Sequence, residues 1–189
     1  MNIPFHKPIL PEKIDSIFSE SIRDGWLTTG PQVNKFELTL SEYIGIDNIV
    51  AVNSCTAALH LALAAKKFKK GDRFIVPTYT FVASVEVGEY LNMEPIIVDN
   101  RPDGFNLDLN QVEDNLKNDS RIKVIIPVHF AGELVDRSQL NYLGNKYGVF
   151  ILEDGAHALE SMASVDTLNN NTAVAFSFYA NKNITTGGE

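Results

Sequence analysis

Cysteine is almost absent from this sequence, because Cys55 is the only one among 189 residues. One thiol cannot close an internal disulfide, and it cannot supply the paired thiolates of a structural zinc site. The amino-terminal stretch lacks the apolar core of a signal peptide. The longest apolar runs fall far short of the ~20 residues that a membrane span requires. These absences predict a cytoplasmic protein that does not enter membranes.

Positive charge is also scarce, because 16 lysine and arginine residues stand against 24 acidic residues, which gives a net charge of −8. Nonspecific binding to nucleic acid or to an acidic membrane needs a basic surface, so neither partner is expected. Lysines do cluster between residues 66 and 70, where an apolar helical pattern ends before Gly71 and Asp72. A solvated helix end is the favoured interpretation of that cluster.

Several common catalytic motifs are missing as well. The sequence contains no G-x-S-x-G elbow, no P-loop and no G-x-G-x-x-G fingerprint. Its four histidines show no zinc-ligand spacing; they are His6, His60, His129 and His157. The sequence therefore argues against a metal site and against the hydrolase and dinucleotide classes that these motifs mark.

What is present is an alternation of short apolar runs and helical stretches. Strands that are apolar throughout suit a sheet covered on both faces, so the pattern predicts an α/β fold with a largely parallel central sheet flanked by helices. Two helices, joined by a loop at 25–31, are expected before the sheet. The predicted strands are 49–53, 73–77, 95–99, 123–128, 149–153 and 173–179. The predicted helices are 11–24, 33–43, 56–67, 82–91, 109–117 and 137–147.

Ligands gather at the carboxyl ends of the strands in sheets of this kind, so the chemistry is expected directly after the apolar runs. Residues 54–56 join a predicted strand to a predicted helix there. The N–H groups of a helix N-terminus, with hydroxyls beside them, suit a phosphate. Simple capping of the helix by Ser54 or Thr56 is the alternative.

Asp154 follows the apolar run 149–153. Its carboxylate could pair with the protonated pyridine nitrogen of pyridoxal phosphate (PLP) and keep the ring electron-withdrawing. The alternative is another helix N-cap. His157, three residues later, is either a hydrogen-bond partner of the cofactor's phenolic oxygen or a satisfied buried histidine.

Lys182 lies five residues after Ser177, directly past the last apolar run. Desolvation of a lysine in such a place frees its amine to attack an aldehyde, and Ser177 is then well placed for a cofactor phosphate. A lysine in a surface loop is the alternative. Phe81, just beyond the run 73–77, could stack on a flat heteroaromatic ring or belong to the core.

Together these segments resemble the sugar-nucleotide aminotransferases of the DegT/StrS group, which are fold-type I PLP enzymes. The resemblance extends through nearly the whole chain, in the family's order and approximate spacing. The motifs that carry it are WLTTGP, NSCTAALHLAL, VPTYTFVAS, PVHFAGE, LEDGAHALE and FSFYANKNITTGGE.

The resemblance implies a role for each matching position. Lys182 matches the lysine that forms the Schiff base with PLP, Asp154 the partner of the pyridine nitrogen, and His157 the polar residue near the ring hydroxyl. Phe81 matches the aromatic residue that stacks on the cofactor ring. The phosphate cradle is matched by Ser54, Cys55, Thr56 and Ser177. A loop near the substrate is matched by Thr28, Thr29 and Gly30.

The implied activity is amino transfer, with glutamate as the usual donor, to a nucleotide-linked keto-sugar in a homodimer. The implied organisation is an N-terminal helix and substrate loop (1–31) followed by an incomplete PLP-binding large domain (32–189). Relatives continue with a smaller C-terminal domain, which is expected to be missing here. A PLP-dependent sugar dehydratase and a non-catalytic binding module are the alternatives. Dehydratases of this scaffold carry histidine in place of the lysine, so Lys182 favours amino transfer.

Overall fold

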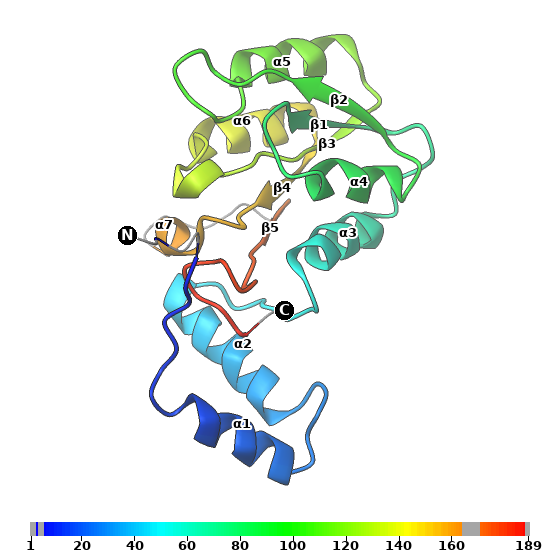
Figure 1. The fold of residues 1–189 in the computed structure, drawn as a ribbon. Coiled ribbons are helices and arrows are strands. Elements are labelled where there is room, and N and C mark those ends of the chain that lie inside the picture. Colours follow the sequence, from blue (N-terminus) through cyan, green and yellow to red (C-terminus); the bar gives the residue numbers. More distant parts are fainter. Residues whose placement is uncertain (1–2, 4–5, 164–170, 188–189) are drawn as a thin grey trace.

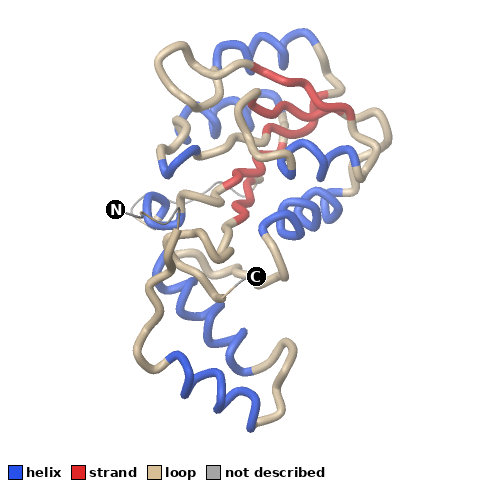
Figure 2. The backbone as a smooth tube through the Cα atoms, viewed as in Figure 1, coloured by secondary structure: helices blue, strands red, loops and turns tan. Residues whose placement is uncertain are grey.

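The computed structural model describes residue 3 and residues 6–163 and 171–187. Its centre is a five-stranded sheet with the order β2-β1-β3-β4-β5, in which every neighbouring pair is parallel (Figures 1 and 2). The expected α/β fold with a parallel sheet is therefore confirmed. The strands are β1 (Arg73–Pro77), β2 (Glu94–Val98), β3 (Ile122–Ile125), β4 (Phe150–Asp154) and β5 (Thr172–Ala175).

Helices cover both faces of this sheet, because parallel strands need crossover connections and helices make them. One face packs against α3 and α4, and the other packs against α5 and α6. Along β1, Phe74 and Val76 point into the first core and Ile75 into the second, as the two-residue period of a strand requires. These helices are α3 (Cys55–Lys66), α4 (Ala83–Glu89), α5 (Leu109–Asn118) and α6 (Arg137–Tyr147).

The remaining helices lie outside this sandwich. Figure 1 shows α2 beside the carboxyl-terminal segment and α1 beyond it, away from the sheet. The apolar stripe predicted on α1 exists, but no residue of α1 is buried, and Phe18 is 54% exposed. These elements are α1 (Ile14–Arg23), α2 (Pro31–Ile44), the 3-10 turn η1 (Phe130–Gly132) and α7 (Leu159–Met162).

The predicted helices are confirmed, each with both ends within three residues of the observed bounds. α6 begins and ends where the sequence predicts. The lysines between residues 66 and 70 are exposed at the end of α3, which confirms the solvated helix end.

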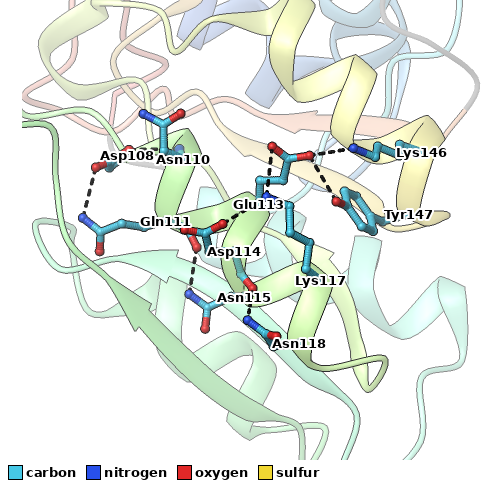
Figure 3. A network of polar contacts seen from close by, with 10 residues as sticks. All are labelled: Asp108, Asn110, Gln111, Glu113, Asp114, Asn115, Lys117, Asn118, Lys146 and Tyr147. Atoms are coloured by element: carbon cyan, nitrogen blue, oxygen red, sulfur yellow. Dashed lines mark hydrogen bonds and ion pairs between the residues drawn. The ribbon is translucent and has the colours of Figure 1, made fainter.

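α5 illustrates how local chemistry builds the outer layer. The Asp108 carboxylate caps the helix by accepting a hydrogen bond from the Asn110 amide at 2.9 Å. On its polar face Glu113 accepts hydrogen bonds from Lys146 (2.8 Å) and Tyr147 (3.1 Å) of α6, as Figure 3 shows. The opposite face is buried at helical spacing through Leu109, Val112 and Leu116. The two helices are thus fastened to each other on the side away from the sheet.

The predicted strand 49–53 is wrong. This segment has no ladder partner among the described residues, and a strand exists only where a neighbour supplies one. The Ala51 amide donates instead to the Glu37 carboxylate of α2 at 2.7 Å. Val50 is 78% exposed.

The last predicted strand, 173–179, is too long, because β5 ends at Ala175. Beyond it Phe176 and Phe178 leave the sheet and pack against α2. The rings of Phe178 and Phe36 meet edge to face with their centroids 4.9 Å apart. This apolar contact turns the following residues away from the sheet and toward the carboxyl ends of the other strands.

Replacing Gly88 with alanine should destabilise the fold. A Cβ at this position of α4 would lie 2.3 Å from the ring of Phe74, which is fully buried in β1. The overpacking outweighs the gain in helix propensity, so we expect a loss of roughly 2 kcal/mol in the free energy of unfolding. Denaturant titration measures it. Gly104→Ala is the matched control, because its nearest atom is 3.7 Å away; a change within about 0.5 kcal/mol is expected there. Equal stability of the two variants would contradict the packing argument.

Candidate active site

A cavity of about 1650 Å³ opens at the carboxyl ends of the strands, beside α2. It exceeds the ~300–1,000 Å³ of a usual small-molecule site and so has room for a cofactor together with a substrate. Its wall includes every residue that the sequence assigns to cofactor binding. These are Ser54, Cys55, Thr56, Phe81, Asp154, His157, Ser177 and Lys182.

The N-terminus of α3 forms one part of the wall. The Ser54 hydroxyl accepts a hydrogen bond from the Ala57 amide at 3.1 Å, so the capping interpretation is correct for this side chain. The Cys55 thiol donates to the Ala175 carbonyl at 3.6 Å, which fastens the start of the helix to the end of β5. Capping does not exclude anion binding, because the first-turn N–H groups of a helix still carry its positive dipole end.

Asp154 is the last residue of β4 and is only 6% exposed. Its backbone is fixed by two hydrogen bonds, from its own amide to the Pro127 carbonyl (2.8 Å) and from the His129 amide to its carbonyl (3.1 Å). Its carboxylate accepts one bond on each oxygen, from the Ser84 hydroxyl (2.7 Å) and from the Ala156 amide (3.1 Å). The helix-cap interpretation is wrong, because the N-cap of α7 is Ala158.

Glu153, the residue before Asp154, is buried on the opposite face of the sheet. Arg137 binds it through two hydrogen bonds of 3.0 and 3.1 Å. The Val135 amide donates to Nδ1 of His129 at 3.0 Å, so Nε2 carries the proton and donates to Glu153 at 2.8 Å. Sequence reasoning missed this group. Its only signal is a second acid inside an apolar strand, where an unpaired charge is too costly to bury.

Lys182 lies in the turn that follows β5, where its amide donates to the Tyr179 carbonyl at 2.9 Å. Its side chain is half-buried and borders the cavity together with half-buried Ser177. Lys182 and Asp154 therefore face a common space, although 28 positions separate them in the sequence. Lys182 thus lies in a loop that borders the cavity, and its role as the Schiff-base lysine stays a prediction.

His157 keeps an exposed surface at the cavity, so the interpretation as a buried histidine is wrong. Partial desolvation of its ring is the main cause that lowers the pKa of His157 below its ordinary value. The positive charge of Lys182 lowers this pKa further, and the negative charge of Asp154 raises it. The three side chains thus act on one another electrostatically.

Phe81 is 75% exposed and lies on the cavity wall, so its interpretation as a core residue is wrong. Two further aromatic residues that sequence reasoning missed, Tyr79 and Phe130, line the same cavity with ring centroids 4.9 Å apart. Both follow the ends of strands, β1 and β3, and this position was the available signal. The site therefore has an aromatic wall that suits a flat ligand.

The predicted substrate loop lies elsewhere. Thr28 and Thr29 are exposed between α1 and α2, and Gly30 is the N-cap residue of α2. A Cβ on Gly30 would lie 2.8 Å from the Trp26 ring, so a small residue is needed here for packing. None of these residues borders the cavity, and their substrate role stays a prediction.

Within the described ranges, no group of three or more histidine, cysteine or acidic side chains is arranged to hold a metal ion. Among the helices that the structure describes, none has the length and apolar character needed to cross a bilayer.

The parallel sheet thus gathers a lysine, an aspartate and a helix N-terminus around one cavity at its carboxyl edge. Residues 8–189 match the DegT/DnrJ/EryC1/StrS aminotransferase family, and the chain belongs to it. It is 34% identical to the spore coat polysaccharide biosynthesis protein SpsC of Bacillus subtilis over 98% of its length, and 36% identical to an uncharacterized protein of Methanocaldococcus jannaschii over 97%. The chain spans about half the length of these relatives, 47% of each.

Solved structures agree with this assignment. A Streptococcus pneumoniae protein described as a sugar aminotransferase superposes with a TM-score of 0.88 in its PMP form, at 33% identity, covering 99% of this chain and 50% of that one. Its PLP form superposes equally well, with a TM-score of 0.88 at 32% identity, covering 100% of this chain and 52% of that one. The fold of this half of the relative is thus the fold of this chain.

The electrostatic coupling of His157 predicts opposite shifts in two variants. Asp154→Asn removes a negative charge that raises the pKa of His157, so this pKa should fall further. Lys182→Ala removes a positive charge that lowers it, so the pKa should rise. NMR titration of the imidazole signals without cofactor measures both. Lys67→Ala, an exposed change at the end of α3, should leave the titration unchanged; shifts of the same sign in both site variants would refute the arrangement.

The buried Glu153 group makes a separate stability prediction. Arg137→Ala leaves a carboxylate with 1% side-chain exposure without its guanidinium partner. Loss of one member of a buried pair costs about 3 kcal/mol or more in the free energy of unfolding. Arg101→Ala, which breaks an exposed pair with Asp103, should change stability by less than about 1 kcal/mol. Chemical denaturation compares the two, and a tolerated Arg137→Ala would show that Glu153 is not held as described.

Proposed function

We propose that this chain is the cofactor-binding part of a PLP-dependent aminotransferase that acts on a nucleotide-linked keto-sugar, with glutamate as the donor. The observation that carries the proposal is the convergence of Lys182, Asp154, Ser177 and the N-terminus of α3 on one cavity. Membership of the aminotransferase family supports the reaction class. The names of two relatives, one a sugar aminotransferase and one a polysaccharide biosynthesis protein, support the sugar substrate.

The residues present fit PLP. Ser177 and the α3 N-terminus offer donors to a phosphate, and the exposed ring of Phe81 offers a face for stacking. Each oxygen of Asp154 has one protein donor and keeps a free lone pair for a ring N–H. When bound, PLP supplies an electron-withdrawing ring that stabilises negative charge on a substrate carbon.

The chain's own groups would then divide the work. The Lys182 amine would hold the cofactor covalently and, once released, move a proton to and from the substrate carbon as general acid and base. The Asp154 carboxylate would keep the ring nitrogen protonated. His157 would donate to the ring hydroxyl, and its lowered pKa favours the neutral imidazole, which has one donor and one acceptor nitrogen.

The complete reaction is proposed for the longer protein of which relatives are examples, since this chain covers 47% of their length. We propose a homodimer in the cytoplasm, with residues 1–31 as helix and substrate loop and residues 32–189 as the PLP-binding domain. Within these ranges, residues 1–2, 4–5, 164–170 and 188–189 lie outside the described part. The dehydratase alternative is disfavoured by the lysine at position 182. A non-catalytic binding module is the second candidate, because the same cavity could bind a ligand without catalysing a reaction.

Cofactor binding tests the proposal directly. Adding PLP to the purified chain should produce a visible absorbance band, and borohydride reduction should fix one PLP on Lys182, located by peptide mass spectrometry. Lys182→Ala should lose essentially all of this adduct, while Lys67→Ala should keep it. A folded Lys182→Ala protein with an undiminished adduct would overturn the assignment. An adduct that glutamate leaves unchanged in the dimeric, full-length protein would favour the binding module.

A further inference from the structure

Ser84 is a buried polar residue that none of the proposed roles uses. It lies in the first turn of α4 and has no solvent exposure. Its hydroxyl is 2.7 Å from Oδ2 of Asp154, although 70 positions separate the two residues. Behind it, Oγ1 of Thr80 is 2.8 Å from the Ser84 oxygen. Two hydroxyls in series therefore lead to the carboxylate.

The directions of these hydrogen bonds follow from proton counting. An ionised carboxylate only accepts, so the single hydroxyl proton of Ser84 goes to Asp154. Thr80 must then donate to Ser84, and its other contact, the Phe81 carbonyl at 3.3 Å, is longer. A hydroxyl bonded to a charged oxygen makes a stronger hydrogen bond than a neutral pair does.

The remaining contacts leave the carboxylate little freedom to rotate. Its second oxygen accepts from the Ala156 amide at 3.1 Å, and its backbone is bonded on both sides. Ser84 itself is held because α4 lies against β1, where Gly88 approaches the Phe74 ring without space for a methyl group. One donor comes from a helix and the other from the turn after β4, so together they fix the plane of the carboxyl group.

We propose that Ser84, supported by Thr80, is a positioning residue that orients the Asp154 carboxylate toward the ring nitrogen of the bound cofactor. This inference rests on the proposed function, since it requires that Asp154 meets a cationic ring. Without Ser84 the carboxylate loses one of its two side-chain hydrogen bonds and is free to rotate in the unloaded protein. Cofactor binding must then fix its orientation, which lowers the affinity. The residue acts through Asp154 and touches no reacting atom.

Equilibrium PLP binding by the purified chain, followed by absorbance, tests this role. Ser84→Ala should weaken PLP affinity about tenfold, the scale of a lost hydrogen bond to a charged group, and Ser84→Thr should restore most of it. Thr80→Val should produce a smaller loss in the same direction. Ser161→Ala is the matched control, because it removes a hydroxyl that donates at 2.7 Å to the Gly132 carbonyl and not to Asp154. It should bind PLP within about twofold of the wild type.

A double-mutant cycle separates positioning from a general structural effect. In the Asp154→Asn background, Ser84→Ala should weaken PLP binding by less than about twofold, because its partner is already changed. Equal effects of Ser84→Ala in both backgrounds, or none in the wild type, would overturn the positioning role and leave the proposed function standing. Full PLP affinity in Asp154→Asn would instead remove the proposed function. Circular dichroism of the unloaded variants confirms that folded proteins are compared.

Discussion

Two adjacent carboxylates are buried at the end of one strand, and side chains from both faces of the sheet are arranged to bind them. Glu153 and Asp154 are 1% and 6% exposed, and a charge taken out of water costs several kcal/mol unless it is paired and hydrogen-bonded. Because successive side chains of a strand point to opposite faces, the two cannot share partners. Glu153 is bound from the α6 side by Arg137, and Asp154 from the α4 side by Ser84. The end of β4 is therefore clamped from both faces.

This clamp defines the geometry of the cavity. The carboxyl ends of parallel strands meet at one edge, so whatever fixes β4 also fixes its neighbours β3 and β5. The α3 N-terminus is joined to β5 through the Cys55 thiol, and the segment after β5 is turned by the packing of Phe178 on α2. The N-terminus of α3, which suits a phosphate, and the turn that carries Lys182 are thus both positioned at the same edge of the sheet.

The sequence predicts this fold well where a local rule decides, and less well where a distant partner does. β1 and α6 have the predicted bounds because a continuous apolar run and a capped amphipathic segment are complete signals in themselves. Residues 49–53 have the composition of a strand, but they pair with no other strand in the part of the chain that the structure describes, so composition misleads. Residues 176–179 look like more of β5, yet Phe176 and Phe178 find a better apolar surface on α2.

The candidate site shows the same division. The rule that ligands gather at strand ends, together with the family resemblance, selects eight cofactor-binding residues that all line the cavity, whereas the predicted substrate loop, residues 28–30, does not. Neither finds Ser84 or Arg137, since each contacts a carboxylate 70 or 16 positions away and looks in the sequence like an ordinary helix residue. The spacing of residues along the sequence predicts the structure of a single helix or strand, but not its contacts with other elements. The partner of a buried charge is known only when the topology brings two elements together.

Burial also separates two kinds of residue around the cavity. Asp154 and its anchors have almost no freedom, because water cannot replace a lost partner there. Phe81, Tyr79 and His157 keep exposed surface, and their side chains can adjust without unsatisfied polar groups being created. Chemistry that must stay constant across a family is best placed on the first kind. Substitutions on the second kind should cost little stability, so the exposed side chains around the cavity tolerate change more readily than the buried carboxylates do.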